Sequence, residues 1–172
     1  SSAASDVYKR QKKRYNRKIA FYCTSTMLSK LIEQFLNHKL GYDPRLNREK
    51  QKEHLLVLRE KGILPHSSLF AYLSKYESLC TAGKRDIGVF GDVILLWQDT
   101  DYLNMLKEKG VPEKYLPLSR TRDWFFLYDK EEDSVLLNDD DDPLRLSEED
   151  FDYYWPSFDQ FLCYFFGLSE SH

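Results

Sequence analysis

The sequence predicts an α+β fold with N-terminal helices, a mostly antiparallel sheet and a closing C-terminal helix. Three observations predict it. Apolar residues recur at helical spacing in 28–36, two strand-like segments flank the polar turn 129–133, and phenylalanines form a helical stripe in 158–166. Because these signals follow one another in blocks, the order is typical of the α+β class.

Three helices are expected before the sheet. The first follows the apolar spacing of 28–36 and ends near Gly41. The second begins at Asn47, a residue type that caps helix N-termini, and ends at Gly62. Its first half is polar, so only three leucines are expected to anchor it: Leu55, Leu56 and Leu58. The third helix follows Pro65 and has one apolar face, formed by Leu69, Tyr72, Leu73 and Tyr76.

The sheet is expected to begin in residues 87–97. Their β-branched and aromatic residues are interrupted by Gly88 and Gly91, which predicts strands with a tight turn or bulge between them. Asp99 is then placed to cap a short helix that ends at Gly110.

The second half of the chain gives clearer strand signals. We predict an extended segment at 115–118, a hairpin of two strands at 124–128 and 134–138, and a short edge strand at 144–147. Ser157 and Gln160 form a capping box at the start of the closing helix. The aromatic face of that helix must be docked, because it would otherwise be a large exposed apolar patch.

The first 26 residues differ from the rest in composition. They carry seven of the 25 Lys and Arg but one of the 28 acids, and residues 1–11 resemble the in-frame translation of a sequencing-library adapter. We therefore expect residues 1–26 to be an artefact or untranslated leader, with the native chain beginning at Met27. Residues 27–172 are expected to form a single domain with 18 basic and 27 acidic residues, a net charge of -9.

Composition and residue spacing argue against a membrane protein, a disulfide-bonded protein and a histidine metal site. The apolar stretches are far shorter than the roughly 20 residues that span a bilayer, so no membrane helix is expected. Three cysteines without C-x-x-C spacing indicate neither a disulfide framework nor a zinc knuckle, and the cytoplasm is the expected compartment. His38, His54 and His66 fall on different predicted elements without metal-site spacing and are expected at the surface.

One pattern suggests a calcium site. Asn138, Asp140, Asp142 and Glu149 fall at positions 1, 3, 5 and 12 of an EF-hand loop, but Pro143 stands where that loop needs glycine. A solvated acidic turn is the favoured interpretation, so neither a metal nor a cofactor is expected. No nucleophile elbow and no phosphate-binding loop occurs in the sequence, which favours a binding protein over an enzyme.

Acidic residues are concentrated in the C-terminal third. Residues 117–172 hold four basic residues against fifteen acids, whereas 27–116 hold fourteen against twelve. A surface of one sign repels nucleic acid and attracts a basic protein, and ordinary solubility explains such a charge equally well. Tyr153, Tyr154 and Trp155 follow the acids and are expected to be partly exposed as anchors for a protein partner.

Several segments together resemble the SUKH superfamily, which includes fungal cell-wall assembly regulators and bacterial immunity proteins. They are Leu64-Pro65 with the helix LFAYLSKY, the LPL at 116–118, the hairpin WFFLYDKEEDSVLLNDDDD and the closing helix SFDQFLCYFF. The resemblance spans about 62–168 and implies an α+β domain without catalytic residues. Members usually carry glycines before the hairpin, where this chain has SRTRD at 119–123.

The resemblance implies a non-catalytic immunity protein that binds and neutralises a toxin domain, often a nuclease. A nuclease needs basic surface to hold phosphate, so an acidic inhibitor can cover that surface without any chemistry. We expect the contact at two groups of acids and the aromatic residues beside them: Asp139, Asp140, Asp141, Asp142, Glu148, Glu149, Asp150, Asp152, Tyr153, Tyr154 and Trp155. Two alternatives stay open, a SUKH-like scaffold or regulatory domain in a larger complex and a calcium-binding or hydrolytic protein that uses the acidic loop.

Overall fold

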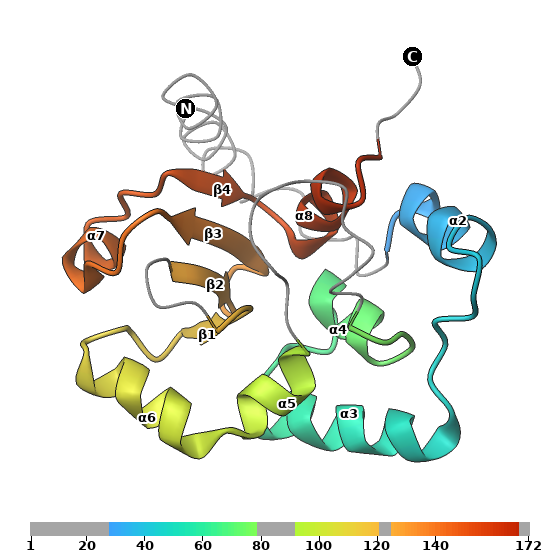
Figure 1. The fold of residues 1–172 in the computed structure, drawn as a ribbon, viewed down its shortest axis with the longest axis horizontal. Helices are drawn as coiled ribbons and strands as arrows, with labels where there is room; N and C mark the ends of the chain where they lie inside the picture. Colours follow the sequence, from blue (N-terminus) through green and yellow to red (C-terminus); the bar gives the residue numbers. More distant parts are fainter. Residues whose placement is uncertain (1–27, 79–91, 121–124, 169–172) are drawn as a thin grey trace.

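The computed structural model describes residues 28–78, 92–120 and 125–168, which form a four-stranded sheet with helices on both faces (Figure 1). The expectations for residues 1–26 and for strands at 87–91 lie outside the described residues. Neighbouring strands are antiparallel, in the order β1 (Tyr115–Pro117), β2 (Phe125–Asp129), β3 (Ser134–Asn138) and β4 (Tyr153–Trp155). Helices precede the sheet and α8 (Phe158–Phe165) follows it, so the predicted α+β class is confirmed.

Capping residues set the start of the helices that precede the sheet. The helices are α2 (Lys30–His38), α3 (Arg48–Glu60) and α4 (Ser68–Leu73), as predicted. The side chains of Ser29, Asn47 and Ser67 each accept a hydrogen bond from the backbone nitrogen three residues later. Gly62 follows α3 with a φ of +71°, a conformation that glycine adopts without strain.

Helix α3 packs through a different face from the one its leucines suggest. Leu58 is buried, but Leu56 is 67% exposed, and His54 and Val57 are buried in its place. At 3.6 residues per turn, positions 54, 57 and 58 share one side of the helix and position 56 points away. His54 Nδ1 lies 2.7 Å from the carbonyl oxygen of Leu73, so the expectation of a surface position is wrong for this histidine.

The segment Val93–Gln98 forms helix α5, where the sequence suggested a strand. Asp92 caps it by accepting a hydrogen bond from the Leu95 backbone nitrogen at 3.3 Å. Four of its six residues are buried, and a short run buried on most sides has no period that separates helix from strand. Helix α6 (Thr100–Glu108) follows directly and is capped by Asp99 as predicted.

Side chains alternate between the two faces of the sheet. One face joins the large core with α4, α5 and α8 and carries Phe126, Tyr128, Val135, Leu137 and Trp155. The other face packs on α6 and on a short helix, α7 (Pro143–Ser147), and carries Tyr115, Phe125, Leu127, Leu136 and Tyr154. Because both faces are covered, β2 and β3 are buried along their whole length.

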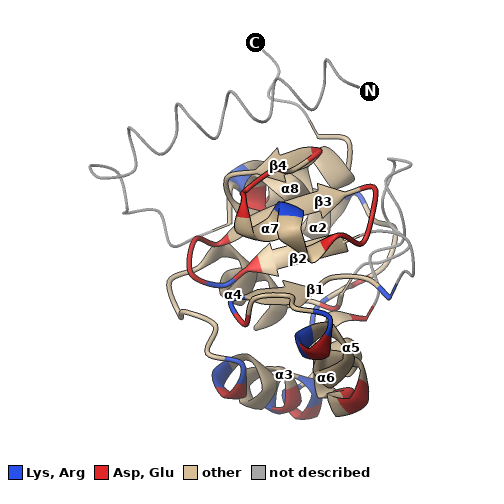
Figure 2. Ribbon diagram, turned by 90° about the vertical axis from the view of Figure 1, so that its left-hand side faces the viewer, with Lys and Arg blue, Asp and Glu red and all other residues tan. Residues whose placement is uncertain are grey.

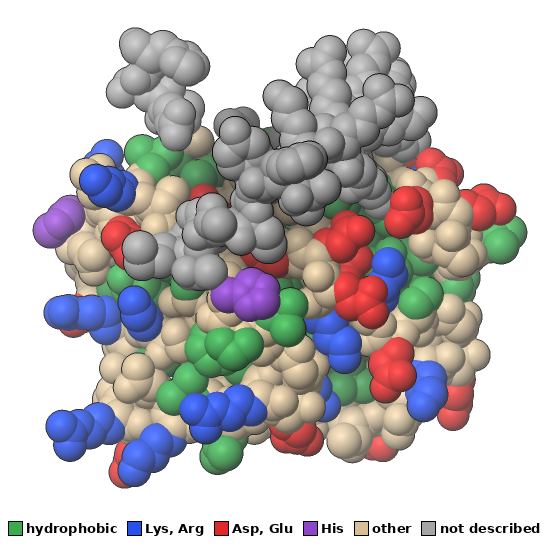
Figure 3. Space-filling model, turned by 180° about the vertical axis from the view of Figure 1, so that it is seen from behind, with side chains coloured by type: hydrophobic (Ala, Val, Ile, Leu, Met, Phe, Trp, Pro, Cys, Tyr) green, Lys and Arg blue, Asp and Glu red, His purple; other side chains and the backbone are tan. Residues whose placement is uncertain are grey.

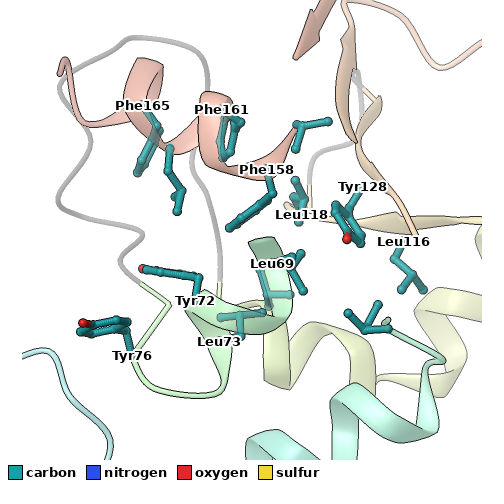
Figure 4. Close-up of a cluster of buried hydrophobic side chains, with 14 of the residues drawn as sticks. Leu69, Tyr72, Leu73, Tyr76, Leu116, Leu118, Tyr128, Phe158, Phe161 and Phe165 are labelled. Carbon is teal, nitrogen blue, oxygen red and sulfur yellow. The ribbon is translucent and has the colours of Figure 1, made fainter. Parts of the chain in front are cut away.

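Helix α8 supplies the aromatic centre of the large core (Figure 4). Phe158 extends from α8 toward Tyr72 of α4, with ring centroids 5.8 Å apart. The ring of Phe161 meets that of Phe126 edge-on at 5.3 Å, so α8 is fixed to the sheet as well as to α4. The predicted N-cap is confirmed, because Ser157 Oγ accepts a hydrogen bond from the backbone nitrogen three residues later at 3.1 Å.

Candidate partner-binding surface

The connection between β3 and β4 contains helix α7, so the edge strand expected at 144–147 is wrong. Asp142 caps α7 by accepting a hydrogen bond from the Leu144 backbone nitrogen at 3.0 Å. Pro143 occupies the first helical position, where its missing N–H removes no hydrogen bond. The leucine–polar alternation suggested a strand, but with this cap and proline the segment makes one helical turn that buries Leu146.

Arg145 lies at the centre of the acidic segment and pairs with four of its carboxylates. Its Nη2 and Nη1 atoms lie 2.8 Å and 3.1 Å from the two carboxylate oxygens of Asp152. Nη1 also lies 2.7 Å from Asp140 and 3.4 Å from Asp139, and Nε lies 3.2 Å from Asp150. The Arg145 side chain is 17% exposed. Helix α7 therefore places one cation between two acidic loops (Figure 2).

The charges of this cluster perturb one another. Burial raises the pKa of Asp152, but hydrogen bonds from the Arg145 side chain and the Asp139 backbone outweigh it and hold the pKa at about 2. The Asp152 carboxylate raises the pKa of Asp139 through a shared hydrogen bond and repulsion. The hydrogen bonds to Asp152 also raise the pKa of Arg145 above its ordinary value. Near neutral pH the central pair is therefore fully ionised.

The other predicted acids lie around this cluster. Asp141 pairs with Lys109 at the end of α6, with 3.3 Å between Nζ and Oδ2. Asp142 is used as the cap of α7. Glu148 and Glu149 are exposed where α7 ends. The structure therefore brings all eight predicted acids into one region, formed by the two connections on either side of α7.

We call residues 139–152 the α7 surface. It carries eight acids, with Arg145 within it and Lys109 beside it, which leaves a formal net charge of -6 among these groups. Leu144 lies within the same segment and is 60% exposed. Figure 3 shows acidic side chains mainly over the end of the molecule that carries the sheet and α7, and basic side chains mainly over the α2 and α3 end. The charge separation of the sequence is therefore also a separation in space.

The three aromatic residues expected as anchors form β4, and two of them are core residues. Tyr154 and Trp155 are 2% and 1% exposed, so the expectation that they are partly exposed is wrong. Strand alternation turns Trp155 toward Phe161 of α8 and turns Tyr154 toward Phe151, on which it stacks at 5.8 Å. Tyr153 is half-buried and stacks on Trp155. Of the three, Tyr153 alone keeps exposed area for a partner.

Two residues to which the structure gives a role in the α7 surface, Arg145 and Leu144, are absent from the predicted contact set. Arg145 is the only lysine or arginine in 131–172, and a lone cation within so many acids is the signal that could have found it. Crowded carboxylates repel one another unless a cation lies between them. Leu144 gives no comparable signal, because a leucine in a short apolar pattern is ordinarily taken as a core residue.

The residues of the EF-hand-like pattern have other roles. Asn138 is fully buried at the end of β3, and its Oδ1 accepts a hydrogen bond from the Asp152 backbone nitrogen at 3.0 Å. Asp140 pairs with Arg145, and Asp142 caps α7. In the part of the chain that the structure describes, no group of three or more histidine, cysteine or acidic side chains is arranged to hold a metal ion. An arginine therefore organises the acidic loop.

Comparisons with known proteins do not assign the chain to a family. No family model matches it, and neither a curated protein nor a solved structure matches it significantly. None of the described helices has the length and apolar character that crossing a membrane requires. Inference of function therefore rests on the fold and on the α7 surface.

Proposed function

We propose that this chain is a non-catalytic protein-binding domain of the SUKH type, an immunity protein that neutralises a basic toxin domain by covering it with the α7 surface. The observation that carries the proposal is a formal net charge of -6 around the exposed Leu144. Charge complementarity speeds the encounter and selects the partner, and a central apolar side chain adds buried area.

The partner that fits this surface is a basic domain with a small apolar pocket. A nuclease holds phosphate on a lysine- and arginine-rich surface, and an acidic protein that covers this surface excludes the nucleic acid. Neutralisation by this route needs no catalytic group. The order of helices, antiparallel sheet and closing α8 agrees with the order that the SUKH resemblance implies, which supports the proposal. The proposal places this binding in the cytoplasm, the compartment that the cysteine pattern favours.

Arg145 has a positioning role in this proposal. It holds Asp140, which precedes α7, together with Asp150 and Asp152, which follow it. The two acidic loops are therefore fixed relative to each other before a partner arrives. A pre-ordered surface loses less conformational entropy on binding, so more of the interaction free energy appears as affinity. Glu148 and Leu144, which are exposed beside this cluster, are the proposed contact residues.

The genomic locus provides the first test. The proposal predicts a neighbouring gene for a large exported protein with a variable, basic C-terminal domain. Co-expression of this chain with that domain is expected to restore growth of cells that the domain alone kills. The Glu148→Lys variant should protect poorly, whereas Glu60→Lys, the same charge reversal on exposed α3, should protect fully. Unrelated neighbouring genes, or no protection by the wild-type chain, would favour the scaffold alternative.

A further inference from the structure

A half-buried carboxylate remote from Arg145 joins the β2–β3 turn to helix α4. Asp133 accepts hydrogen bonds from the Ser68 backbone nitrogen at 2.8 Å, the Ser68 hydroxyl at 2.5 Å and the Leu69 backbone nitrogen at 3.3 Å. The Tyr128 hydroxyl donates a fourth at 2.7 Å. Because Ser68 and Leu69 begin α4, Asp133 satisfies backbone donors of a helix that lies more than sixty residues away in the chain.

The same network reaches α8 and α2. The backbone oxygen of Asp133 accepts a hydrogen bond from the Phe158 nitrogen at 2.7 Å, at the start of α8. The Ser68 hydroxyl accepts one from the Asp159 backbone nitrogen at 3.0 Å. The Asp159 carboxylate in turn accepts one from the backbone nitrogen of Ser29, the N-cap of α2, at 2.7 Å. The N-termini of three helices are therefore linked to the hairpin through two carboxylates.

No cation in the described part of the chain pairs with Asp133. The titratable groups around it are Tyr128 and Asp129 from β2 and Asp159 from α8, with Glu33 of α2 beside Asp159. Helix α4 contains no charged residue. Hydrogen-bond donors and the positive ends of helix dipoles are therefore what stabilise this half-buried carboxylate.

We propose that Asp133 is a conformational latch whose ionisation state sets how firmly α2, α4 and α8 are held against the sheet. The geometry supports this role, because one carboxylate and its backbone oxygen bridge segments that are far apart in sequence. Lys130 of the same turn does not neutralise the carboxylate, since its Nζ lies 3.4 Å from the carbonyl oxygen of Lys61. The charge of Asp133 therefore acts directly on the hydrogen bonds that join these segments.

The direction of the pH dependence follows from burial. Burial raises the pKa of Asp133, against the opposing effect of the hydrogen bonds from Ser68 and Tyr128. A raised pKa means that the folded protein binds this proton more tightly than the unfolded chain does. The stabilisation is therefore complete below the ordinary carboxyl pKa and is lost as the pH rises through the folded-state pKa. The latch holds more firmly in acidic solution and less firmly at neutral pH.

Hydrogen exchange of the full chain, corrected for intrinsic rates, tests the latch with α6 as the internal reference. Protection of α2, α4 and α8 relative to α6 should fall about tenfold between acidic and neutral pH. In Asp133→Asn this pH dependence should disappear at α4, whose first backbone nitrogens bond to Asp133. In Asp159→Asn it should weaken at α2 and persist at α4, because Asp133 still bonds to Ser68 and Leu69. In Ser68→Ala, α8 should exchange faster while the pH dependence remains.

Two results would overturn the latch. One is that, in the wild-type protein, the hydrogen-exchange protection of α2, α4 and α8 relative to the reference does not change with pH. This measurement does not depend on the folding of any variant. The other is a pH dependence that Asp133→Asn retains in full. Carboxyl carbon NMR of the wild-type protein gives an independent reading, because a titration of Asp133 below the ordinary aspartate range contradicts the proposed direction.

Discussion

Arg145 and Asp152 form a two-point ion pair that joins α7 to the chain entering β4. The two contacts measure 2.8 Å and 3.1 Å, and the Asp152 backbone nitrogen is itself bonded to buried Asn138 of β3. The pair therefore connects an exposed acidic loop to the sheet. Without it, the carboxylates around Arg145 would repel one another, and the loops on either side of α7 would lose their common support.

Removal of this cation should destabilise the protein moderately. Arg145→Ala is expected to lower the free energy of unfolding by about 1–2 kcal/mol, because the carboxylates it pairs with are partly exposed and screened by water. Arg145→Lys keeps the charge but lacks the two-point geometry, so it should recover only part of the loss. Urea unfolding at low and high salt measures the stability of both variants. Full wild-type stability of Arg145→Ala would argue against a stabilising role for the ion pairs of Arg145.

Acid should weaken the same pair. The pKa of Asp152 is held at about 2, below its ordinary value of 3.8, so its stabilising contribution is present above pH 3.8 and is lost as the pH falls through about 2. The difference in unfolding free energy between the wild type and Asp152→Asn should therefore shrink over this interval. Denaturant titrations at a series of pH values measure it. A difference that stays constant would show that the charge of Asp152 is not involved.

The difference in burial between Phe161 and Leu144 should give their alanine variants very different losses of stability. Phe161 is fully buried among the rings of the large core, and Phe161→Ala is expected to cost about 3–5 kcal/mol of stability. Leu144 is 60% exposed, so Leu144→Ala should change stability by less than about 0.5 kcal/mol. Thermal or denaturant unfolding distinguishes the two. Equal losses would mean that Leu144 is part of the core and is unavailable to a partner.

Periodicity and capping predicted most of the fold that the structure describes. Helices α3, α6 and α8 begin at the capping residues that the sequence indicates, α2 follows the predicted apolar spacing, and the hairpin of β2 and β3 lies where its polar turn places it. Helices α5 and α7 lie where the sequence pattern predicts strands. Both are short, and five or six residues do not complete enough turns to establish a helical period. An Asp N-cap was the remaining sign in each, at Asp92 and Asp142.

The acidic residues of the candidate site were predictable, but its apolar part was not. Eight acids close in sequence were expected to be close in space, and they are. Which aromatic residues face solvent depends on strand pairing, and the pairing of β4 with β3 buries Tyr154 and Trp155. The exposure of Leu144 likewise depends on α7 being a helix, with Leu146 taking the core position. The burial of Tyr154 and Trp155 and the exposure of Leu144 are therefore both set by tertiary packing, which local sequence does not encode.

The most direct test of the proposed function is calorimetric titration of this chain with the C-terminal domain encoded beside it, at low and high salt. The account predicts that binding weakens as salt is added and that Glu148→Lys and Leu144→Ser each weaken it by about tenfold or more. Glu60→Lys, on the exposed surface of α3, should bind like the wild type. Binding that ignores salt and both α7-surface variants, or that Glu60→Lys weakens equally, would contradict the assignment of the α7 surface.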